Sequence, residues 1–114
     1  MTIKQIATRM IALCAKKKFK EARYELFADD AVCFEADNKK LKGLKALERK
    51  HEVWMGSMEK IHGLKISKPL INGNFFSIAY TWDVTYKGQE RGGWKEIGVY
   101  EVKDEKVVLE KYFY

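Results

Sequence analysis

Apolar side chains recur at three- and four-residue steps in three stretches of the N-terminal half of the chain. These stretches cover residues 3–15, Lys18–Phe27 and Leu44–Met58. Apolar residues at this spacing lie on one face of a helix, so each stretch predicts an amphipathic helix. Asp29 and Asp30 predict a turn that ends the second helix, and Val32–Ala36 predicts a short strand before the third.

The C-terminal half changes to a period of two, which is the period of strands. Strands are predicted over Leu64–Leu70, Phe75–Tyr86, Arg91–Val102 and Lys106–Phe113, with a hairpin signal at Asn72-Gly73. Helices that precede a meander of long strands indicate an α+β fold, with the helices on one face of the sheet. Such a sheet twists and curls, so we expect the helices to cover the concave face of an open cone.

Length and composition favour one globular domain over residues 1–114. Hydrophobic residues make up 46% and charged residues 33%, a balance that argues against disorder. No apolar run approaches the roughly 18 residues that a membrane-spanning helix needs, and polar residues interrupt the first stretch as in an amphipathic helix rather than a signal peptide. No membrane partner is therefore expected.

The two cysteines and the basic balance narrow the chemistry further. Cys14 and Cys33 belong to no CxxC pair and have no histidine at metal-binding spacing, which predicts reduced, buried thiols in a cytoplasmic protein without a metal or organic cofactor. The net charge is +6, with basic residues gathered at residues 16–20 and 39–45. No nucleic-acid motif accompanies them and no aromatics interleave with them, so we interpret them as solvated surface and expect no nucleic-acid partner.

Both ends of the domain resemble one known family. The stretch Leu26-Phe27-Ala28-Asp29-Asp30-Ala31-Val32 resembles the end of the second helix and the first strand of SnoaL-like and ketosteroid-isomerase-like proteins. The stretch Glu96–Val108, with Tyr112-Phe113-Tyr114, resembles the closing hairpin of SnoaL-like domains. The resemblance implies a nuclear-transport-factor-2-like cone, in which three N-terminal helices pack on the concave face of a curved, mostly antiparallel sheet. That fold hosts isomerases, cyclases, dehydratases and transport adaptors, so it does not select a function.

The comparison with the isomerases predicts which part of their chemistry is missing. Their catalytic base falls on Glu35, a sensible replacement for aspartate. Their oxyanion-hole aspartate falls on Gly98, and their oxyanion-hole tyrosine falls near Met10 or Ile11. None of these three side chains donates a hydrogen bond, so the resemblance implies that steroid isomerisation is not the function.

Four ionisable residues are considered for the pocket, and three of them, Glu35, His51 and Glu96, are predicted as acid–base candidates. Glu35 alternates with Phe34, and the resemblance implies that it faces the pocket; the alternative is a glutamate that reaches solvent or pairs with a lysine. His51 lies on the apolar stripe of the third helix, either as a core histidine or as a partner of Glu35. Glu96 and Glu110 lie on strand faces, where each is either a second pocket carboxylate or a solvent-facing residue.

The aromatic residues predict the wall of a pocket. The candidates for ligand binding are Trp54, Tyr80, Trp82, Trp94, Tyr100 and Tyr112. They serve equally well as ordinary core, but in a cone they would line an apolar site for a small ligand. On the opposite face, Ala79, Thr81, Ile97 and Val99 leave a partly apolar sheet surface, which predicts a homodimer through that face.

Three hypotheses follow for the function. A small-molecule binding protein would have an apolar pocket with few convergent ionisable groups. A small isomerase, cyclase or dehydratase would use Glu35, with His51 or Glu96, on an apolar carbonyl compound and would bring at least two such groups to one ligand. An interaction module would use its sheet face and have a filled or absent cavity.

Overall fold

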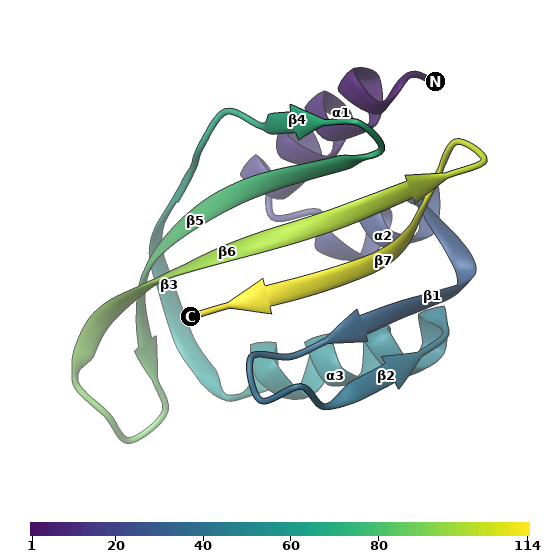
Figure 1. Ribbon diagram of the computed structural model, residues 1–114. Coiled ribbons are helices and arrows are strands. Elements are labelled where there is room, and N and C mark those ends of the chain that lie inside the picture. The colour runs from purple at the N-terminus through teal and green to yellow at the C-terminus, as the bar shows by residue number, and fades with distance from the viewer.

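Three helices lie on one side of a curved seven-stranded sheet in the computed structural model, which describes residues 1–114 (Figure 1). The helices are α1 (Ile3–Ala15), α2 (Phe19–Leu26) and α3 (Leu44–Gly56). The strands are β1 (Phe27–Phe34), β2 (Lys40–Lys42), β3 (Met58–Ile66), β4 (Leu70–Asn72), β5 (Phe75–Tyr86), β6 (Arg91–Lys103) and β7 (Lys106–Phe113). The α+β cone expected from the sequence is confirmed.

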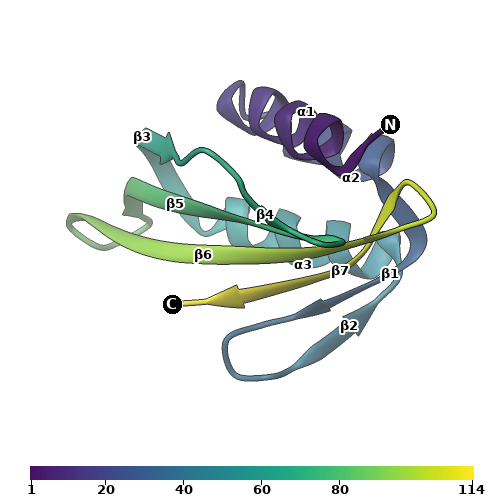
Figure 2. The ribbon, with the colours of Figure 1, turned by 45° about the horizontal axis from the view of Figure 1, so that its top comes forward.

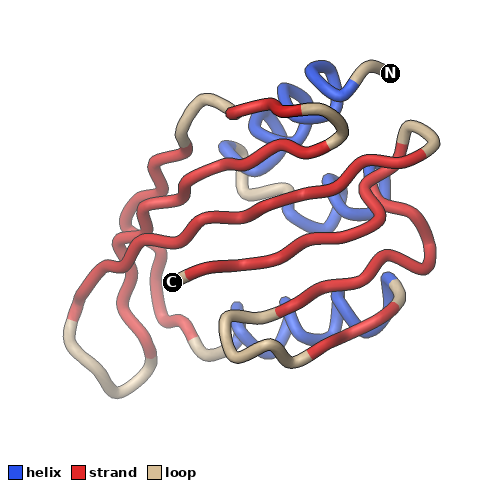
Figure 3. The backbone as a smooth tube through the Cα atoms, viewed as in Figure 1, coloured by secondary structure: helices blue, strands red, loops and turns tan.

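The sheet is antiparallel except for one pair of strands. Its order is β2-β1-β7-β6-β5-β3, with β4 paired to β5, and β1 runs parallel to β7. The long strands β5, β6 and β7 form its centre, and the backbone trace shows them curving together (Figure 3). Seen from the side, the helices cover one face and leave the other face uncovered (Figure 2).

The local sequence explains where the first helix begins and which face it buries. The Thr2 side chain accepts a hydrogen bond from the backbone of Gln5, whose side chain bonds back to Thr2, a reciprocal capping box. Ile6, Met10 and Leu13 then face the sheet and are buried. The helix thus covers the hollow of the sheet along one apolar stripe.

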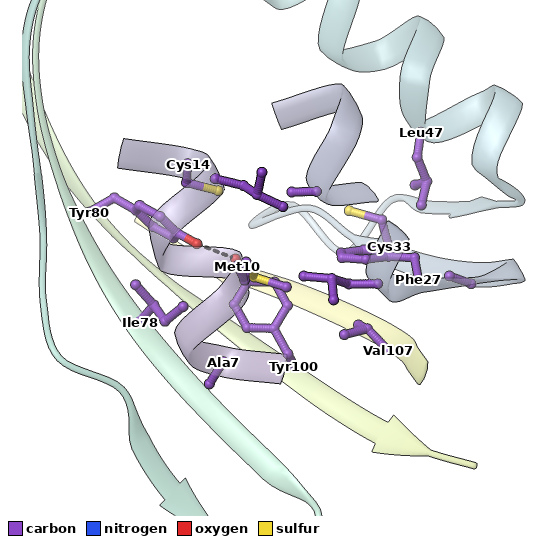
Figure 4. Packing of buried hydrophobic residues seen from close by; sticks show 14 of the residues in the cluster. Ala7, Met10, Cys14, Phe27, Cys33, Leu47, Ile78, Tyr80, Tyr100 and Val107 are labelled. Carbon is purple, nitrogen blue, oxygen red and sulfur yellow. Dashed lines mark hydrogen bonds between the residues drawn. The ribbon is translucent and has the colours of Figure 1, made fainter. Parts of the chain in front are cut away.

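The core forms where the inward face of β5 meets the helices. The alternating residues Phe76, Ile78, Tyr80, Trp82 and Val84 are all buried, as the period of two predicts. Tyr80 packs near Met10 and Cys14 of α1, while Val107 and Phe27 close the other side (Figure 4). The hydrophobic core thus extends from β5 and α1 to the start of β7.

The predicted turn at Asp29 and Asp30 is wrong. Both residues lie inside β1, which begins at Phe27 directly after α2. Phe27 pairs with Val107 and Val32 pairs with Leu109. An advance of five residues along β1 is therefore matched by an advance of only two residues along β7. A bulge in the parallel pairing absorbs the extra residues, and pairing with β7 overrides the turn preference of aspartate.

The boundary after the third helix also differs from the prediction. The helix ends at Gly56 rather than Met58, and β3 starts at Met58 rather than Leu64. The predicted strand to Leu70 ends at Ile66, and the predicted strand to Ala36 ends at Phe34. Residues 58–66 of β3 pair with residues 80–86 of β5, a long-range interaction that sets the limits of β3. The short strands β2 and β4 were not predicted. None of the three helices has the length and apolar character needed to cross a membrane.

Candidate functional site

A cavity of about 660 Å³ opens between the helices and the concave face of the sheet. Side chains from all three helices and from β1, β5, β6 and β7 line it, and 13 of its 20 lining residues are hydrophobic, so its wall is mainly apolar. The structure places all nine predicted site residues along this wall: Glu35, His51, Trp54, Tyr80, Trp82, Trp94, Glu96, Tyr100 and Tyr112. Two separate periodicities, helical and strand, therefore converge on one site.

An aromatic surface forms one side of the cavity. Trp82 of β5 and Trp94 of β6 are cross-strand partners, and their rings stack with centroids 5.6 Å apart and planes 16° apart. Tyr86 continues the stack beyond Trp94 at 5.8 Å. Trp54 of α3 meets both tryptophans edge-on and donates its indole N–H to the Tyr86 hydroxyl at 3.2 Å. This arrangement is a preformed aromatic wall, since each ring fixes the next.

Glu35 pairs with Lys50 rather than with His51. The Lys50 ammonium forms a half-buried salt bridge with the Glu35 carboxylate and also lies 5.0 Å from the centre of the Tyr112 ring. Burial opposes the charge of Lys50, but the Cys33 thiol and the Glu35 and Glu110 carboxylates outweigh it, so the pKa of Lys50 is raised. Lys50 therefore remains a cation at neutral pH and does not act as a free amine nucleophile.

His51 lies among aromatic rings and carries no charge at neutral pH. Its ring is 5.2 Å from that of Phe19 and 5.5 Å from that of Trp54. Burial, with the positive charges of Arg23 and Lys50 nearby, lowers the pKa of His51 from 6.5 to about 4. No hydrogen bond or salt bridge joins it to Glu35, so the expected acid–base pair is not formed in this structure.

Glu96 carries a half-buried carboxyl group on the side of the cavity that the aromatic rings form. Its Oε1 accepts a hydrogen bond from the Trp82 indole at 3.1 Å. Burial raises the pKa of Glu96 above its ordinary value, although the Trp82 hydrogen bond and the Lys50 charge oppose the change. A carboxyl shifted in this direction holds or releases a proton closer to neutral pH than an exposed glutamate does.

Glu110 and Arg23 form a second, deeper ion pair. Glu110 is 1% exposed and Arg23 is 9% exposed. The Arg23 Nη2 lies 3.5 Å from Glu110 Oε1, and the Tyr112 hydroxyl donates to Glu110 Oε2 at 3.0 Å. Of the two alternatives for Glu110, the structure shows the pocket carboxylate and not the solvent-facing residue.

Two buried tyrosine hydroxyls lie near Gly98, the residue at which the sequence comparison predicted that a hydrogen-bond donor is missing. A Cβ on Gly98 would lie 2.5 Å from the Tyr100 hydroxyl and 2.9 Å from its ring carbon Cζ, so the Tyr100 ring covers the glycine. The Tyr80 and Tyr100 hydroxyls are 2.7 Å apart and share a hydrogen bond (Figure 4). Burial raises the pKa of both phenols, so both stay protonated; one O–H donates to the other oxygen, and the second O–H is left to donate elsewhere. The absence of a side chain at residue 98 therefore does not leave this region without donors.

The C-terminal tyrosines have different positions in the wall. Tyr112 is half-buried and contacts Glu110 and Lys50. Tyr114 is 70% exposed, yet its hydroxyl lies 3.5 Å from Glu35 Oε2 and its ring borders the cavity. Tyr112 thus belongs to the lining, and Tyr114 lies at the rim.

Among the lining residues that the sequence analysis did not predict, Arg23 and Lys50 are the two that form ion pairs in the cavity wall. Both lie outside the basic clusters at residues 16–20 and 39–45 and were not considered as site residues. A signal was available, because Arg23 lies four residues after Phe19 and Lys50 lies three residues after Leu47, on or beside the buried faces of their helices. No group of three or more His, Cys, Asp or Glu side chains is arranged to hold a metal ion.

Sequence comparison decides the family. The family model of the SnoaL-like domain matches residues 1–114. The chain belongs to the SnoaL-like domain family. Among curated proteins, none matches the sequence significantly.

Solved structures of SnoaL-like and NTF2-like proteins agree with this assignment. A SnoaL-like protein from Mesorhizobium loti, proposed to be a polyketide cyclase, is 31% identical over 100% of both chains, with a TM-score of 0.93. An NTF2-like protein of unknown function from Burkholderia pseudomallei is 12% identical, covers 100% of this chain and 92% of its own, and has a TM-score of 0.83. TerC, crystallised with polyporic acid, is 9% identical over 99% of this chain and 92% of its own, with a TM-score of 0.82. The last two similarities concern the fold alone.

Proposed function

We propose that this SnoaL-like protein binds a small, flat, largely apolar molecule in its cavity. The observation that carries the proposal is the preformed surface of stacked rings built by Trp82, Trp94 and Tyr86. The cavity volume of about 660 Å³ lies within the range of small-molecule sites. A rigid aromatic surface loses little entropy when a planar ligand stacks on it, so the site favours planar compounds.

The same proposal includes the location of the protein. Cys14 and Cys33 are both free and buried, with no disulfide between them. Unpaired cysteines are typical of a reducing compartment, so we infer a cytoplasmic protein.

Energy transfer from tryptophan to a bound dye tests the binding proposal. All three tryptophans of the chain line the cavity, so a dye bound there lies close to every donor and receives energy efficiently. N-phenyl-1-naphthylamine is an uncharged aromatic dye that becomes fluorescent in apolar sites and accepts energy from tryptophan. We expect saturable dye emission on excitation of the wild-type tryptophans, because the dye would lie among them.

A pair of variants makes the experiment specific. Trp94→Leu removes part of the ring surface and should weaken dye binding about tenfold, since stacking and buried area are both lost. Tyr24→Leu removes an exposed aromatic outside the cavity and should change nothing. Absence of saturable transfer, or equal affinity in both variants, would refute the proposal.

Acid–base catalysis on a bound carbonyl compound is the second candidate function. The observation in its favour is that carboxyl and phenol groups converge on the apolar cavity: Glu96 has a raised pKa, and Tyr80 and Tyr100 offer protonated hydroxyls. In this scheme the Glu96 carboxylate removes a proton from the carbon next to the carbonyl, a tyrosine hydroxyl donates to the enolate oxygen, and the carboxyl returns the proton to carbon. Glu35 is engaged with Lys50, so Glu96 is the candidate base with fewer competing contacts.

Proton exchange on a simple ketone separates the two functions. The flat ketone 2-tetralone exchanges its α-hydrogens for deuterium in D₂O, and proton NMR follows the exchange. Catalysis predicts faster exchange with wild-type protein and a loss of at least about tenfold in Glu96→Gln, in line with general-base contributions. Exchange no faster than buffer, while the naphthylamine dye still binds, would leave binding as the function.

An interaction module is the least supported of the three hypotheses. That hypothesis expected a filled or absent cavity, whereas the cone holds an open one of about 660 Å³. The apolar sheet face is instead compatible with self-association of a ligand-binding protein.

A further inference from the structure

Two neighbouring polar atoms in the cavity wall have no hydrogen-bond partner. They are Nε of Arg23 and Oε1 of Glu110, both completely buried. The Arg23 and Glu110 side chains line the cavity, and Glu110 is 99% buried, being 1% exposed. The Glu110 Oε2 is already bonded to Tyr112, so Oε1 is the free acceptor of this carboxylate.

Unpaired buried polar atoms of this kind are uncommon in folded proteins. Leaving a buried donor or acceptor without a partner destabilises the folded protein, and more so when the group is charged. The Arg23 Nη2 is 3.5 Å from Glu110 Oε1, which keeps the charges together without supplying the missing hydrogen bonds. A donor and an acceptor with unused hydrogen-bonding capacity thus belong to two paired side chains that line the cavity.

We propose that Arg23 and Glu110 form a subsite for an uncharged hydroxyl group of the ligand. The hydroxyl oxygen accepts from the Arg23 Nε–H, and its hydrogen donates to Glu110 Oε1. This inference rests on the proposed function and adds to it the group by which the ligand is selected.

Charge and geometry favour a hydroxyl over other polar groups. The ion pair has no net charge, so it gives neither an anionic nor a cationic ligand group an unbalanced charge to bind. The guanidinium and the carboxylate are within ion-pair distance, so one oxygen atom that both accepts and donates can bridge them. A phenolic hydroxyl on a planar ring fits both this subsite and the aromatic surface of the same cavity.

A matched pair of probes tests the inference on the unmodified protein. 2-Naphthol and 2-methylnaphthalene have nearly the same shape, but only the first offers a hydroxyl. Nitrogen-15 NMR follows the three tryptophan indole signals, which report occupancy of the cavity, and the Arg23 Nε–H signal, which reports its hydrogen bond. We expect both probes to shift the indole signals, with 2-naphthol binding about tenfold or more tightly, since a hydrogen bond to a charged group contributes on this scale. Only 2-naphthol should move the Arg23 Nε–H signal downfield.

The outcomes separate this inference from the function beneath it. Equal affinities with an unmoved Arg23 signal would overturn the subsite while leaving aromatic binding intact. No indole shift with either probe would refute both. Glu110→Gln keeps the side-chain shape and should reduce the preference for 2-naphthol several-fold, whereas the control Glu101→Gln, at a carboxylate outside the cavity, should keep it. If Glu110→Gln does not fold, the comparison of the two probes on wild type still decides the question.

Discussion

Alanine at Gly98 of β6 should destabilise the fold through a side-chain clash, in contrast to Gly93, where a Cβ would lie 2.5 Å from the backbone carbonyl oxygen of Trp82. A Cβ there would lie 2.5 Å from the Tyr100 hydroxyl and 2.9 Å from its Cζ, so the ring must move. Overpacking of this kind costs about 1–3 kcal/mol, and restriction of the unfolded chain returns about 0.4–1 kcal/mol. We therefore expect Gly98→Ala to lower the free energy of unfolding by about 1–2 kcal/mol and the Tm by about 4 °C per kcal/mol.

Gly92 provides the matched control on the same strand. A Cβ on Gly92 would meet nothing within 4 Å, so Gly92→Ala should be neutral or stabilising by up to about 1 kcal/mol. Urea unfolding followed by circular dichroism measures both variants. The Tyr100→Phe substitution should cost less in the Gly98→Ala background than in wild type, because the displaced ring has already lost its bond to Tyr80. Equal stability of the two alanine variants would show that the Tyr100 ring does not cover Gly98 in solution.

Three further predictions concern the ionisable groups and the free sheet face. The pKa of His51 is about 4 in the folded protein and 6.5 ordinarily. The folded protein therefore keeps its full stability above pH 6.5, and the free energy of unfolding falls by about 3 kcal/mol in all as the pH drops toward 4 and folding opposes protonation of His51. Urea titrations across this range should show the slope, and His51→Phe should flatten it; an unchanged slope contradicts the assignment. We propose a homodimer through the free sheet face, so light scattering should find a dimer, and Ile97→Glu on that face should dissociate it. The control Val53→Glu introduces the same charge on the outer side of α3 and should leave the dimer intact. A monomeric wild-type protein would reject the homodimer. Arg23→Met alone should lower the free energy of unfolding in urea by about 3–5 kcal/mol, because it leaves Glu110 buried without an opposite charge. The double variant Arg23→Met/Glu110→Met should recover most of that loss. A double variant no more stable than the single variant would show that the two residues are not coupled.

The fold could be predicted where one face of an element is buried along its whole length. The alternation from Phe76 to Val84 identified a strand because every second residue enters the core. The prediction failed at Asp29 and Asp30 and at the start of β3, where pairing with β7 and β5 decides the conformation. Local preferences carry no information about a partner strand that lies far along the chain, so those boundaries required the structure.

The same division applies to the site. Rings such as Trp82 and Trp94 were placed correctly because strand alternation fixes the face on which a side chain lies. The partners of the charged residues were not predictable in the same way. Arg23 meets Glu110 across 87 positions of sequence, and the pairing of Glu35 with Lys50 joins β1's end to α3. A charged residue on an apolar helix face signals burial, but only the tertiary packing shows which opposite charge it meets.

The energetic cost of these pairs is itself an argument that the cavity is used. Replacing a buried ion pair with apolar side chains of similar size is often neutral or stabilising, so the Arg23–Glu110 pair is a poor means of holding the fold together. The helices and β5 already provide a hydrophobic core that does not depend on it. A polar pair that stability does not require, lying inside an otherwise apolar cavity with one donor and one acceptor unused, is accounted for by a molecule that enters the cavity and satisfies both.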